Sequence, residues 1–547
     1  MAKNTTLKTP EIKIAGKKVF KETGLTYIEL SAKLRSGKTR KFVVERAIFA
    51  DPKGLHRFFL SMNAQLPTNY IDAKPYILEL IGSENVRAID VVNSMGMYGK
   101  TFVTAHGSYG ADPGIEVYEM PEPKDQIVVG MTSGNLRGYL KAIKPVVAKS
   151  RILRLLLGAQ CASVVASLVL LKEPAIFHLG GPSGTGKTAL MRLTMAMIGR
   201  ANEEDPKTYS ATEAGLEDYF FFYRNTLTVI DELGTKSSDP KELVKLMTKL
   251  SYVFASRKGR QLTAIYKKMT GKSQRTWNQF GVSSGEKTLK ELAAECGERV
   301  PEGALRRLID VPVTKDQTVL DIHKEGSQPS ESKALNTVIK ACEGVQKHHG
   351  VALKKLVEWA VANGRVREEF DVERQKFMSL VGVNTGWQHA VVKKLAECCA
   401  GGVLGIRAGV IPCAEAQYTA SIRRLCHELL KYSSPSFFDV KKLAVSLVKS
   451  CGDNSKVIVK TNKGKYPALD PQKSLGYVLV KKGKKFAILF PKRLDELTGS
   501  RNATRDLAEH LKAHNRLWLG SRGSLTQPVD IPGQPKQIRC YRLKLKG

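Results

Sequence analysis

The chain has 547 residues, of which 42% are hydrophobic, and this is several times what one hydrophobic core needs. At roughly 150 residues per domain, three or four globular domains are expected, and a disordered tail is excluded. Lys and Arg number 87 against 52 Asp and Glu, and the resulting net charge of +35 points to a polyanionic partner, with nucleic acid as the first candidate.

The cysteines, the N-terminus and the apolar segments indicate the cellular compartment of the protein. The nine cysteines form no CxxC pair, which argues against a disulfide framework and against a structural zinc site. The N-terminus lacks the apolar core of a signal peptide, so a cytoplasmic location is expected. One apolar run, residues 155–171, approaches transmembrane length but carries Gln160, Ser163 and Ser167. We therefore expect a buried helix and no membrane contact.

Residues 20 to about 140 alternate apolar and polar side chains in short runs that Gly and Pro interrupt. This period of two predicts strands and turns, with one helix from Pro52 to Ala64. We therefore expect a small α+β N-terminal domain over residues 1–134.

From residue 135 the pattern changes to helices that alternate with strands too apolar to be half-exposed, AIFHL and TLTVI. Such strands are typical of a parallel sheet covered on both faces, so residues 135–322 are predicted to form an α/β core. After a polar stretch, apolar residues recur at helical spacing, and residues 323–431 are expected to form a helical lid. The fold class is thus α/β and multidomain.

The segment AIFHLGGPSGTGKTAL contains the pattern G-x-x-x-x-G-K-[ST] between an apolar strand and a predicted helix, which is the context of a Walker A phosphate loop. Its glycines allow backbone N–H groups to surround phosphates at the helix N-terminus. Lys187 is expected to reach the β- and γ-phosphates of ATP, and Thr188 to bind Mg²⁺. The residues of the loop are Gly181, Pro182, Ser183, Gly184, Thr185, Gly186, Lys187 and Thr188.

Asp231 and Glu232 end the apolar strand LTVI, and Asp231 follows the lysine by 231 − 187 = 44 residues. Acids at this place are typical of a Walker B strand. Asp231 is therefore expected to hold Mg²⁺, and Glu232 to act as the general base toward the attacking water. The pair favours ATP hydrolysis over phosphoryl transfer to a small molecule.

Residues 431–547 hold 25 Lys and Arg against 8 Asp and Glu, which is 25 − 8 = +17, about half of the total excess. Two strands, two helices and an expected hairpin of WLGS with QIRCYRLKL follow one another as in a winged helix, so residues 432–547 are predicted to be a basic winged-helix-like DNA-binding domain. Leu507 and Leu511 share the buried face of one helix. A winged helix that docks a protein is the alternative. The cations expected to meet DNA are Arg505, Lys512, Arg522, Lys536 and Arg539.

Two further segments resemble those of AAA+ ATPases. TWNQFGVSSGEKTL predicts a third buried strand whose end, Ser283-Ser284, lies where these proteins carry their sensor-1 residue, usually Asn. A Ser helix cap before GEKTLKELA is the competing interpretation of Ser284. GALRRLIDVPV resembles the segment that offers an arginine to the nucleotide of the neighbouring subunit, which implies Arg307, or else Arg306, as an arginine finger.

HLGGPSGTGKT, ATEAGLE, VIDELG, VSSGE and RLIDVP occur in an order and spacing that resembles domain-of-unknown-function family 927 over roughly residues 25–430. The better understood members of that family are replication helicases of bacterial mobile elements, similar to MCM proteins. The resemblance implies an AAA+ P-loop core in a homo-oligomeric ring, expected to be a hexamer, that uses ATP and Mg²⁺ to translocate on single-stranded or forked DNA. It also implies a winged-helix-like C-terminal extension.

Between the second and third strands, SRKGRQLTAIYKKMTGKSQRTW consists of two extended pieces around a basic turn, where MCM-like helicases insert a pore hairpin. Translocation needs phosphate contacts that ignore sequence, so the cations of this segment are candidates, with a solvated loop as the alternative. They are Lys267, Lys268, Lys272 and Arg275.

Together these features predict an ATP-dependent DNA helicase that initiates replication of a mobile genetic element. Two alternatives stay open. One is an origin-binding protein that uses ATP as an assembly switch without unwinding, and the other is an ATPase that remodels protein or RNA in phage defence.

Overall fold

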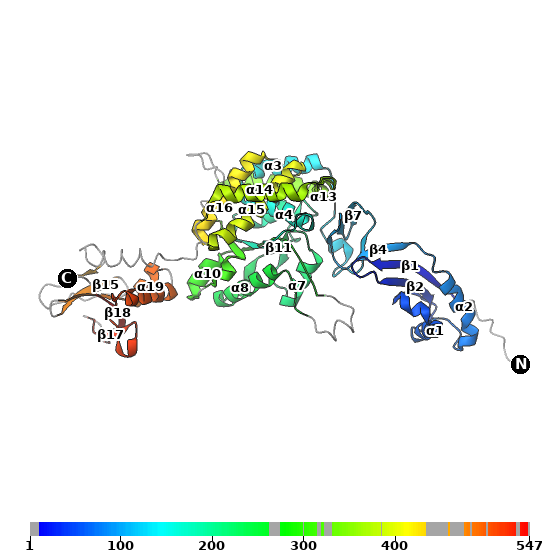
Figure 1. Cartoon of the computed structure of the whole chain (residues 1–547), viewed down its shortest axis with the longest axis horizontal. Coiled ribbons are helices and arrows are strands. Elements are labelled where there is room, and N and C mark those ends of the chain that lie inside the picture. Colours follow the sequence, from blue (N-terminus) through cyan, green and yellow to red (C-terminus); the bar gives the residue numbers. More distant parts are fainter. Residues whose placement is uncertain are drawn as a thin grey trace.

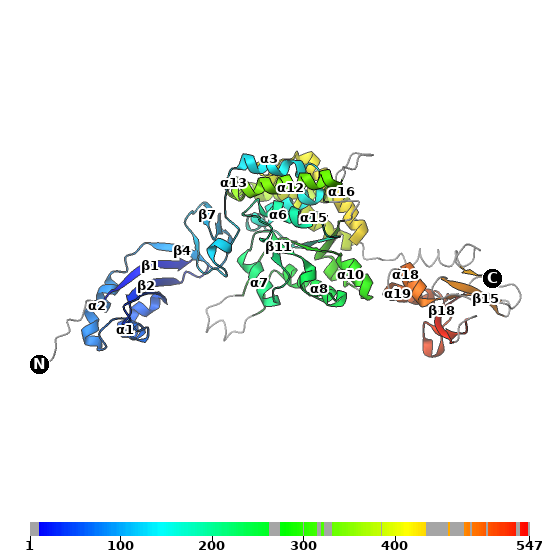
Figure 2. The same ribbon diagram turned by 180° about the vertical axis from the view of Figure 1, so that it is seen from behind.

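The computed structural model describes residues 10–261, 274–298, 300–313, 319–321, 331–383, 386–433, 458–459, 475–481, 484–498, 501–531 and 536–544. Figures 1 and 2 show a central body with a smaller N-terminal part at one end and the C-terminal part at the other.

The N-terminal part is a sheet that shares its core with two helices. The strand order is β3-β2-β1-β4-β8, with β1, β2 and β3 antiparallel and β4 parallel to β1. Alternation in β3 buries Phe42 and Val44, which belong to one core with Leu55 and Phe59 of the first helix. The elements are β1 (Ile12–Phe20), β2 (Thr26–Lys33), β3 (Thr39–Glu45), α1 (Pro52–Ser61), α2 (Tyr70–Gly82), β4 (Ala88–Val92) and β8 (Glu116–Val117).

A second, three-stranded sheet links this part to the central body. Its strands are β5 (Gly96–Tyr98), β6 (Thr101–Thr104) and β7 (Gly107–Gly110). Met97, Phe102 and Val103 are buried in the same core as the central helices, so the sheet is anchored by apolar packing.

The central sheet has five strands in the order β10-β11-β12-β9-β13, and every neighbouring pair is parallel. In β9, Ile176 belongs to one apolar core while Phe177 and Leu179 belong to another on the opposite face. This explains why AIFHL is apolar at every position except His178. The strands are β9 (Ile176–Gly180), β10 (Lys207–Thr208), β11 (Thr228–Asp231), β12 (Gly281–Gly285) and β13 (Leu308–Pro312).

Helices cover both faces of this sheet. Residues of α7, α8 and α10 pack with Ile176 on one face. A layer of helices covers the other face and is shown at the top of Figure 1. Some of these helices precede the strands of the sheet in the sequence, and the others follow them. The helices that lie between the strands of this sheet in sequence are α6 (Lys187–Met195), α7 (Glu213–Phe222), α8 (Pro240–Ser256) and α10 (Leu289–Cys296).

The helical layer combines α3 and α4 with the helices that the sequence assigns to a lid. Every residue of α4 is buried, so the apolar run at 155–171 begins as a core helix, as expected. Within the described residues, no helix has the length and apolar character to cross a membrane. The layer consists of α3 (Leu136–Val147), α4 (Arg151–Val164), α12 (Glu331–Lys347), α13 (Val351–Ala362), α14 (Val366–Val381), α15 (Gly386–Arg407) and α16 (Glu415–Ser433).

The C-terminal part is a five-stranded sheet in the order β14-β15-β16-β18-β17. Leu507 and Leu511 are buried together, as their spacing predicts, against Leu543 of the sheet. The expected pairing of WLGS with QIRCYRLKL is confirmed at its start, where Leu517 forms an antiparallel bridge with Leu543 and the Trp518 N–H donates to the Arg542 carbonyl oxygen. The strands that pair with β18 are β17, which begins at Gln527, and β16. The elements are β14 (Ile458–Val459), β15 (Gly476–Lys481), β16 (Lys484–Leu489), α18 (Pro491–Thr498), α19 (Arg501–Ala513), β17 (Gln527–Val529) and β18 (Ile538–Lys544).

The contact between α4 and α15 gives a stability prediction. A Cβ added at Gly401 would lie 2.5 Å from the Gly158 carbonyl oxygen and 2.6 Å from the Ala162 Cβ. Helix propensity alone makes Gly401→Ala stabilising by about 1 kcal/mol. We expect the opposite sign, because overpacking costs about 1–3 kcal/mol.

Thermal unfolding followed by circular dichroism measures the effect as a lower midpoint. Gly82→Ala at the end of α2, where an added Cβ meets nothing within 4 Å, is the control and should leave the midpoint unchanged or raise it. A Gly401→Ala protein that melts at or above the wild-type temperature contradicts the close packing.

Candidate functional site

The glycine-rich loop joins β9 to α6 at the carboxyl edge of the central sheet. Gly184 and Gly186 have φ of 78° and 94°, a left-handed conformation that favours glycine. A Cβ at Gly181 would lie 1.8 Å from the Val313 carbonyl oxygen, so this position has no room for a side chain. The loop thus turns tightly into α6, whose first N–H groups have no partner within the helix.

Lys187, the first residue of α6, folds back over the loop. Its Nζ donates to the carbonyl oxygens of Gly181 and Pro182, both at 2.7 Å. Burial lowers the pKa of Lys187, and the carboxylates of Asp231 and Glu286 oppose this shift. The ammonium is therefore held at the loop by carbonyl groups that a phosphate oxygen can replace.

Asp231 ends β11 and accepts hydrogen bonds from three groups. Thr188 Oγ1 donates to one carboxylate oxygen at 2.8 Å, while the Glu232 backbone N–H, at 2.9 Å, and the Ser284 hydroxyl donate to the other. The structure thus brings together the hydroxyl and the carboxylate that the sequence assigns to Mg²⁺.

The donor set suits that ion. Mg²⁺ takes one or two protein oxygens and completes its octahedron with phosphate and water oxygens. The described residues contain no cluster of three or more His, Cys, Asp or Glu that could hold a metal. Thr188 and Asp231 therefore fit a metal that arrives with phosphates.

Glu232 follows directly and is exposed. Its φ of 55° is left-handed, which costs a residue with a side chain about 1–3 kcal/mol and is typical of functional sites. The Glu232 N–H is held by Asp231 and lies 3.2 Å from the Ser284 hydroxyl oxygen. The backbone is thus fixed, while the side chain of Glu232 stays exposed next to Asp231.

The two serines of β12 have different partners. Ser284 bonds to Asp231, whereas Ser283 lies 2.8 Å from Nδ1 of His178 on β9. The helix-cap interpretation of Ser284 was wrong, because Thr288 caps α10 in a capping box with Glu291.

His178 is a site residue that the sequence analysis missed. Its Nε2 lies 3.0 Å from the Lys287 carbonyl oxygen, and burial lowers its pKa to about 4, so the ring is neutral and joins β9 to β12. A single histidine in an apolar strand carries no local signal of this role.

Arg307 lies between α11 (Glu302–Leu305) and β13, at the opposite edge of the sheet from the loop. Pairing runs from Leu308 with Ile176 to Pro312 with Gly180, and these four residue steps separate the two edges of the sheet by about 13 Å. The Arg307 guanidinium donates to the Gly303 carbonyl oxygen at 2.7 Å and lies 4.8 Å from the Tyr252 ring. Arg306 pairs with Glu302 at 3.1 Å.

The expected hairpin is described only at its base. Lys258 and Thr276 form an antiparallel bridge, and the Gly259 N–H donates to the Arg275 carbonyl oxygen at 3.0 Å. Two chain segments therefore pair where the sequence predicts the stem. Three of the expected DNA contacts lie outside the described residues: Lys267, Lys268 and Lys272.

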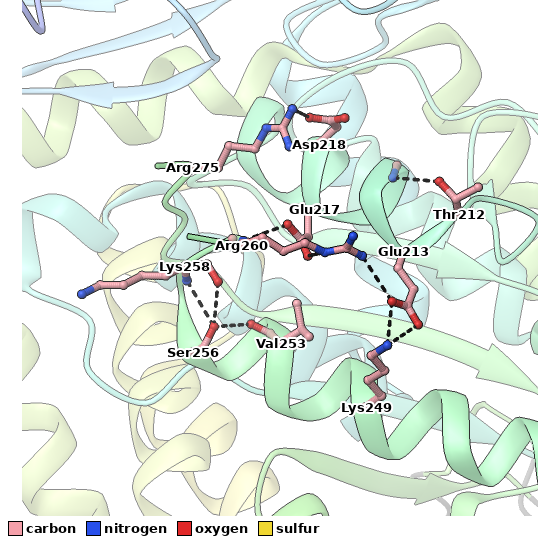
Figure 3. Close-up of polar contacts among 12 residues, drawn as sticks. Thr212, Glu213, Glu217, Asp218, Lys249, Val253, Ser256, Lys258, Arg260 and Arg275 are labelled. Atoms are coloured by element: carbon pink, nitrogen blue, oxygen red, sulfur yellow. Dashed lines mark hydrogen bonds and ion pairs between the residues drawn. The ribbon is translucent and has the colours of Figure 1, made fainter. Parts of the chain in front are cut away.

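The stem is bound to the acidic side of α7 (Figure 3). Glu217, with an exposed side-chain fraction of 6%, accepts from the Arg260 backbone N–H and Nε, both at 3.1 Å. Glu213 accepts from Lys249 at 2.7 Å and from Arg260 at 3.3 Å. Arg275, expected to contact phosphates, pairs here with Asp218, so in this structure it anchors the stem.

The C-terminal cations lie on two elements. Arg505 and Lys512 are exposed on α19, where Lys512 pairs with Glu509 at 3.2 Å. Lys536 is exposed just before β18, and Arg539 donates to Thr526 Oγ1 at 3.2 Å. The side chain of Arg522 lies outside the description.

The Ser284 bond to Asp231 yields a prediction about Mg²⁺. Groups that orient a metal ligand are worth about 10–100-fold in metal affinity. We expect Ser284→Ala to raise by that factor the Mg²⁺ concentration needed for half-maximal binding of a fluorescent ATP analogue.

Ser283→Ala is the matched control, because its hydroxyl faces His178 and not the carboxylate. An equal loss in both variants would mean that the strand, and not the hydroxyl on Asp231, sets the metal affinity.

Comparison with known proteins agrees with the motifs. A family model described as Domain of unknown function (DUF927) matches residues 4–275, close to half of the chain. No curated protein matches. This match ends at Arg275, well before residue 430, where the resemblance read from the motifs was expected to end.

Two solved structures are similar. The structure titled "SCCmec type IV Cch - active helicase" covers 98% of this chain and 93% of its own, with a TM-score of 0.56 at 15% identity, and it shows a shared fold. "The A form apo structure of NrS-1 C terminal region-CTR" covers 70% of this chain and 83% of its own at 13% identity, and its TM-score of 0.25 carries no argument. By this match, residues 4–275 of the chain belong to the DUF927 family.

Proposed function

We propose that the chain is an ATP-dependent DNA helicase of a mobile genetic element, built on an AAA+ core and active as a ring, with a hexamer as the expected size. The observation that carries the proposal is the hydrogen bond between Thr188 and Asp231 beside a glycine-rich loop that opens a helix. These groups meet because β9 and β11 end at one edge of a parallel sheet, where ligands of such sheets bind.

Under this proposal, each residue of the site has a separate role in ATP hydrolysis. The backbone N–H groups of the loop bind the phosphates, and Lys187 exchanges its carbonyl partners for β- and γ-phosphate oxygens. Thr188 and Asp231 would hold Mg²⁺, which would supply positive charge against the phosphates. Glu232 accepts the proton of the attacking water, since its carboxylate is exposed next to these ligands.

Charge and fold support DNA as the polymer. The net charge is +35, and the cations of the 258–275 segment and of the C-terminal part offer sequence-independent phosphate contacts. The shared fold with a structure titled as an active helicase supports the same proposal. Under it, the stem on α7 presents the basic turn to a strand in the ring, and the C-terminal part contacts duplex DNA.

Two measurements test this function together: ATP hydrolysis with and without single-stranded DNA, and displacement of a labelled strand from a fork. A helicase shows stimulated hydrolysis and displacement. Hydrolysis without displacement supports the ATP switch, and stimulation by RNA or protein alone supports the remodelling ATPase.

Two substitutions should separate binding from turnover. Lys187→Ala removes the cation on the β- and γ-phosphates, so we expect it to abolish nucleotide binding. Glu232→Gln keeps every phosphate contact, so binding should persist while hydrolysis falls by about 10²–10⁴-fold with the loss of the base. Equilibrium binding and single-turnover hydrolysis measure the two effects. Wild-type turnover in Glu232→Gln would exclude that residue as the base.

Arg307 should act on a neighbouring subunit, because about 13 Å of strand separates it from its own phosphate loop. Head-to-tail packing brings such a residue to the next site. Mixing inactive Lys187→Ala with inactive Arg307→Ala should restore part of the hydrolysis, since some interfaces regain both groups.

Arg306→Ala is the control, because its guanidinium pairs with Glu302 in its own subunit, and it should stay active alone. No recovery at any mixing ratio, in a mixture shown to exchange subunits, would count against a shared site.

A further inference from the structure

Trp518, between α19 and β18, is the exposed tryptophan of the described residues. Its exposed fraction is 42%, against 2% for Trp277 and 6% for Trp387, while Trp359 is half-buried. The Trp518 backbone N–H donates to the Arg542 carbonyl oxygen at 2.8 Å, which fixes the indole at the edge of the sheet. A large exposed ring held by the backbone is unusual, because tryptophan is mostly buried on average.

Three side chains pack around this ring. Phe486 of β16 lies 5.4 Å away with the planes at 83°, and the Arg542 guanidinium lies 4.5 Å from the Phe486 ring and 5.4 Å from the indole. Lys544 Nζ lies 5.6 Å from the indole. We name Trp518, Phe486, Arg542 and Lys544 the aromatic-cation platform.

The platform lies on the sheet face that turns away from the helices. Ala487 and Leu543, the strand neighbours of Phe486, Arg542 and Lys544, pack in the core with α18 and α19. Because side chains alternate along a strand, the platform residues point to the opposite face. The cations Arg505 and Lys512 belong to α19 and are thus a different surface.

The charges of the platform have no carboxylate partner among the described residues. Lys544 Nζ donates to the neutral Asn515 side chain at 2.7 Å, and the buried Arg542 Nε has no hydrogen-bond partner in that part of the chain. Residues 515–544 contain six Lys and Arg and one acid, Asp530. An anionic polymer is therefore the complementary partner.

We propose that the aromatic-cation platform binds single-stranded DNA, with a base stacked on Trp518 and phosphates paired with Arg542 and Lys544. Stacking needs an unpaired base with a free face, which a duplex interior does not offer, and exposed aromatics among cations are the usual means of binding single strands. Unlike the proposed helicase action, this binding requires no nucleotide.

Tryptophan fluorescence of the full chain tests the site in the absence of ATP. Oligo(dT) should quench the emission of wild-type protein, because a stacked base quenches an exposed indole. Trp518→Leu should lose this quench and bind labelled oligo(dT) about 5- to 150-fold more weakly, the range measured for one stacked base. Trp518→Phe should lose the quench but keep most of the affinity, which separates stacking from misfolding.

Two controls and a salt titration complete the experiment. Trp359→Phe should keep the quench, and Arg542→Ala and Lys544→Ala should each lower the salt slope of log K by about 0.7. A quench that persists in Trp518→Leu overturns the proposal. So does equal quenching by a duplex of the same length, or tighter binding of oligo(U) than of oligo(dT). Because no ATP is present, a failed helicase assay leaves this result intact.

Discussion

The hydrogen bonds on the Asp231 carboxylate are the interaction on which the central body depends. Three donors from separate segments meet there: the Thr188 hydroxyl of α6, the Ser284 hydroxyl of β12 and the N–H of Glu232. Burial of a carboxylate without hydrogen-bond donors costs free energy. The three bonds to Asp231 therefore hold α6 after the phosphate loop, strand β12 and the turn after β11 in one arrangement. The elements that meet at the carboxyl edge of the sheet therefore form the site by themselves.

The remaining architecture follows from how this sheet is covered. Helices from before and after the sheet in sequence share one apolar core with it, and α4 is buried along its whole length. Close packing of this kind resists sliding between the layer and the sheet. Side chains on the surfaces outside that core, which carry most of the charges, can be substituted without disturbing this packing.

Local patterns made much of the site predictable. The loop at 181–188 and the acids after β11 are contiguous motifs, and a parallel sheet brings such segments to one edge. The partners of Arg275 and Ser284 were not predictable, because Asp218 and Asp231 are separated from them by more than fifty residues. The pairing of Leu517 and Trp518 with the last strand was predicted, but the strand Gln527–Val529, which pairs with the start of β18, was not. His178 was missed because its polar partners lie on β12 and in the loop that follows it.

The position of α7 has a mechanical consequence. On one side the helix is tied to β11 by the Tyr219 hydroxyl, which donates to the Val229 carbonyl oxygen at 3.2 Å. On another side Glu217 holds the Arg260 backbone and guanidinium. Val229 lies two residues before Asp231. Helix α7 therefore connects the strand that carries the Asp231 carboxylate to the base of the stem. Any displacement of β11 is therefore passed through these bonds on α7 to the base of the stem.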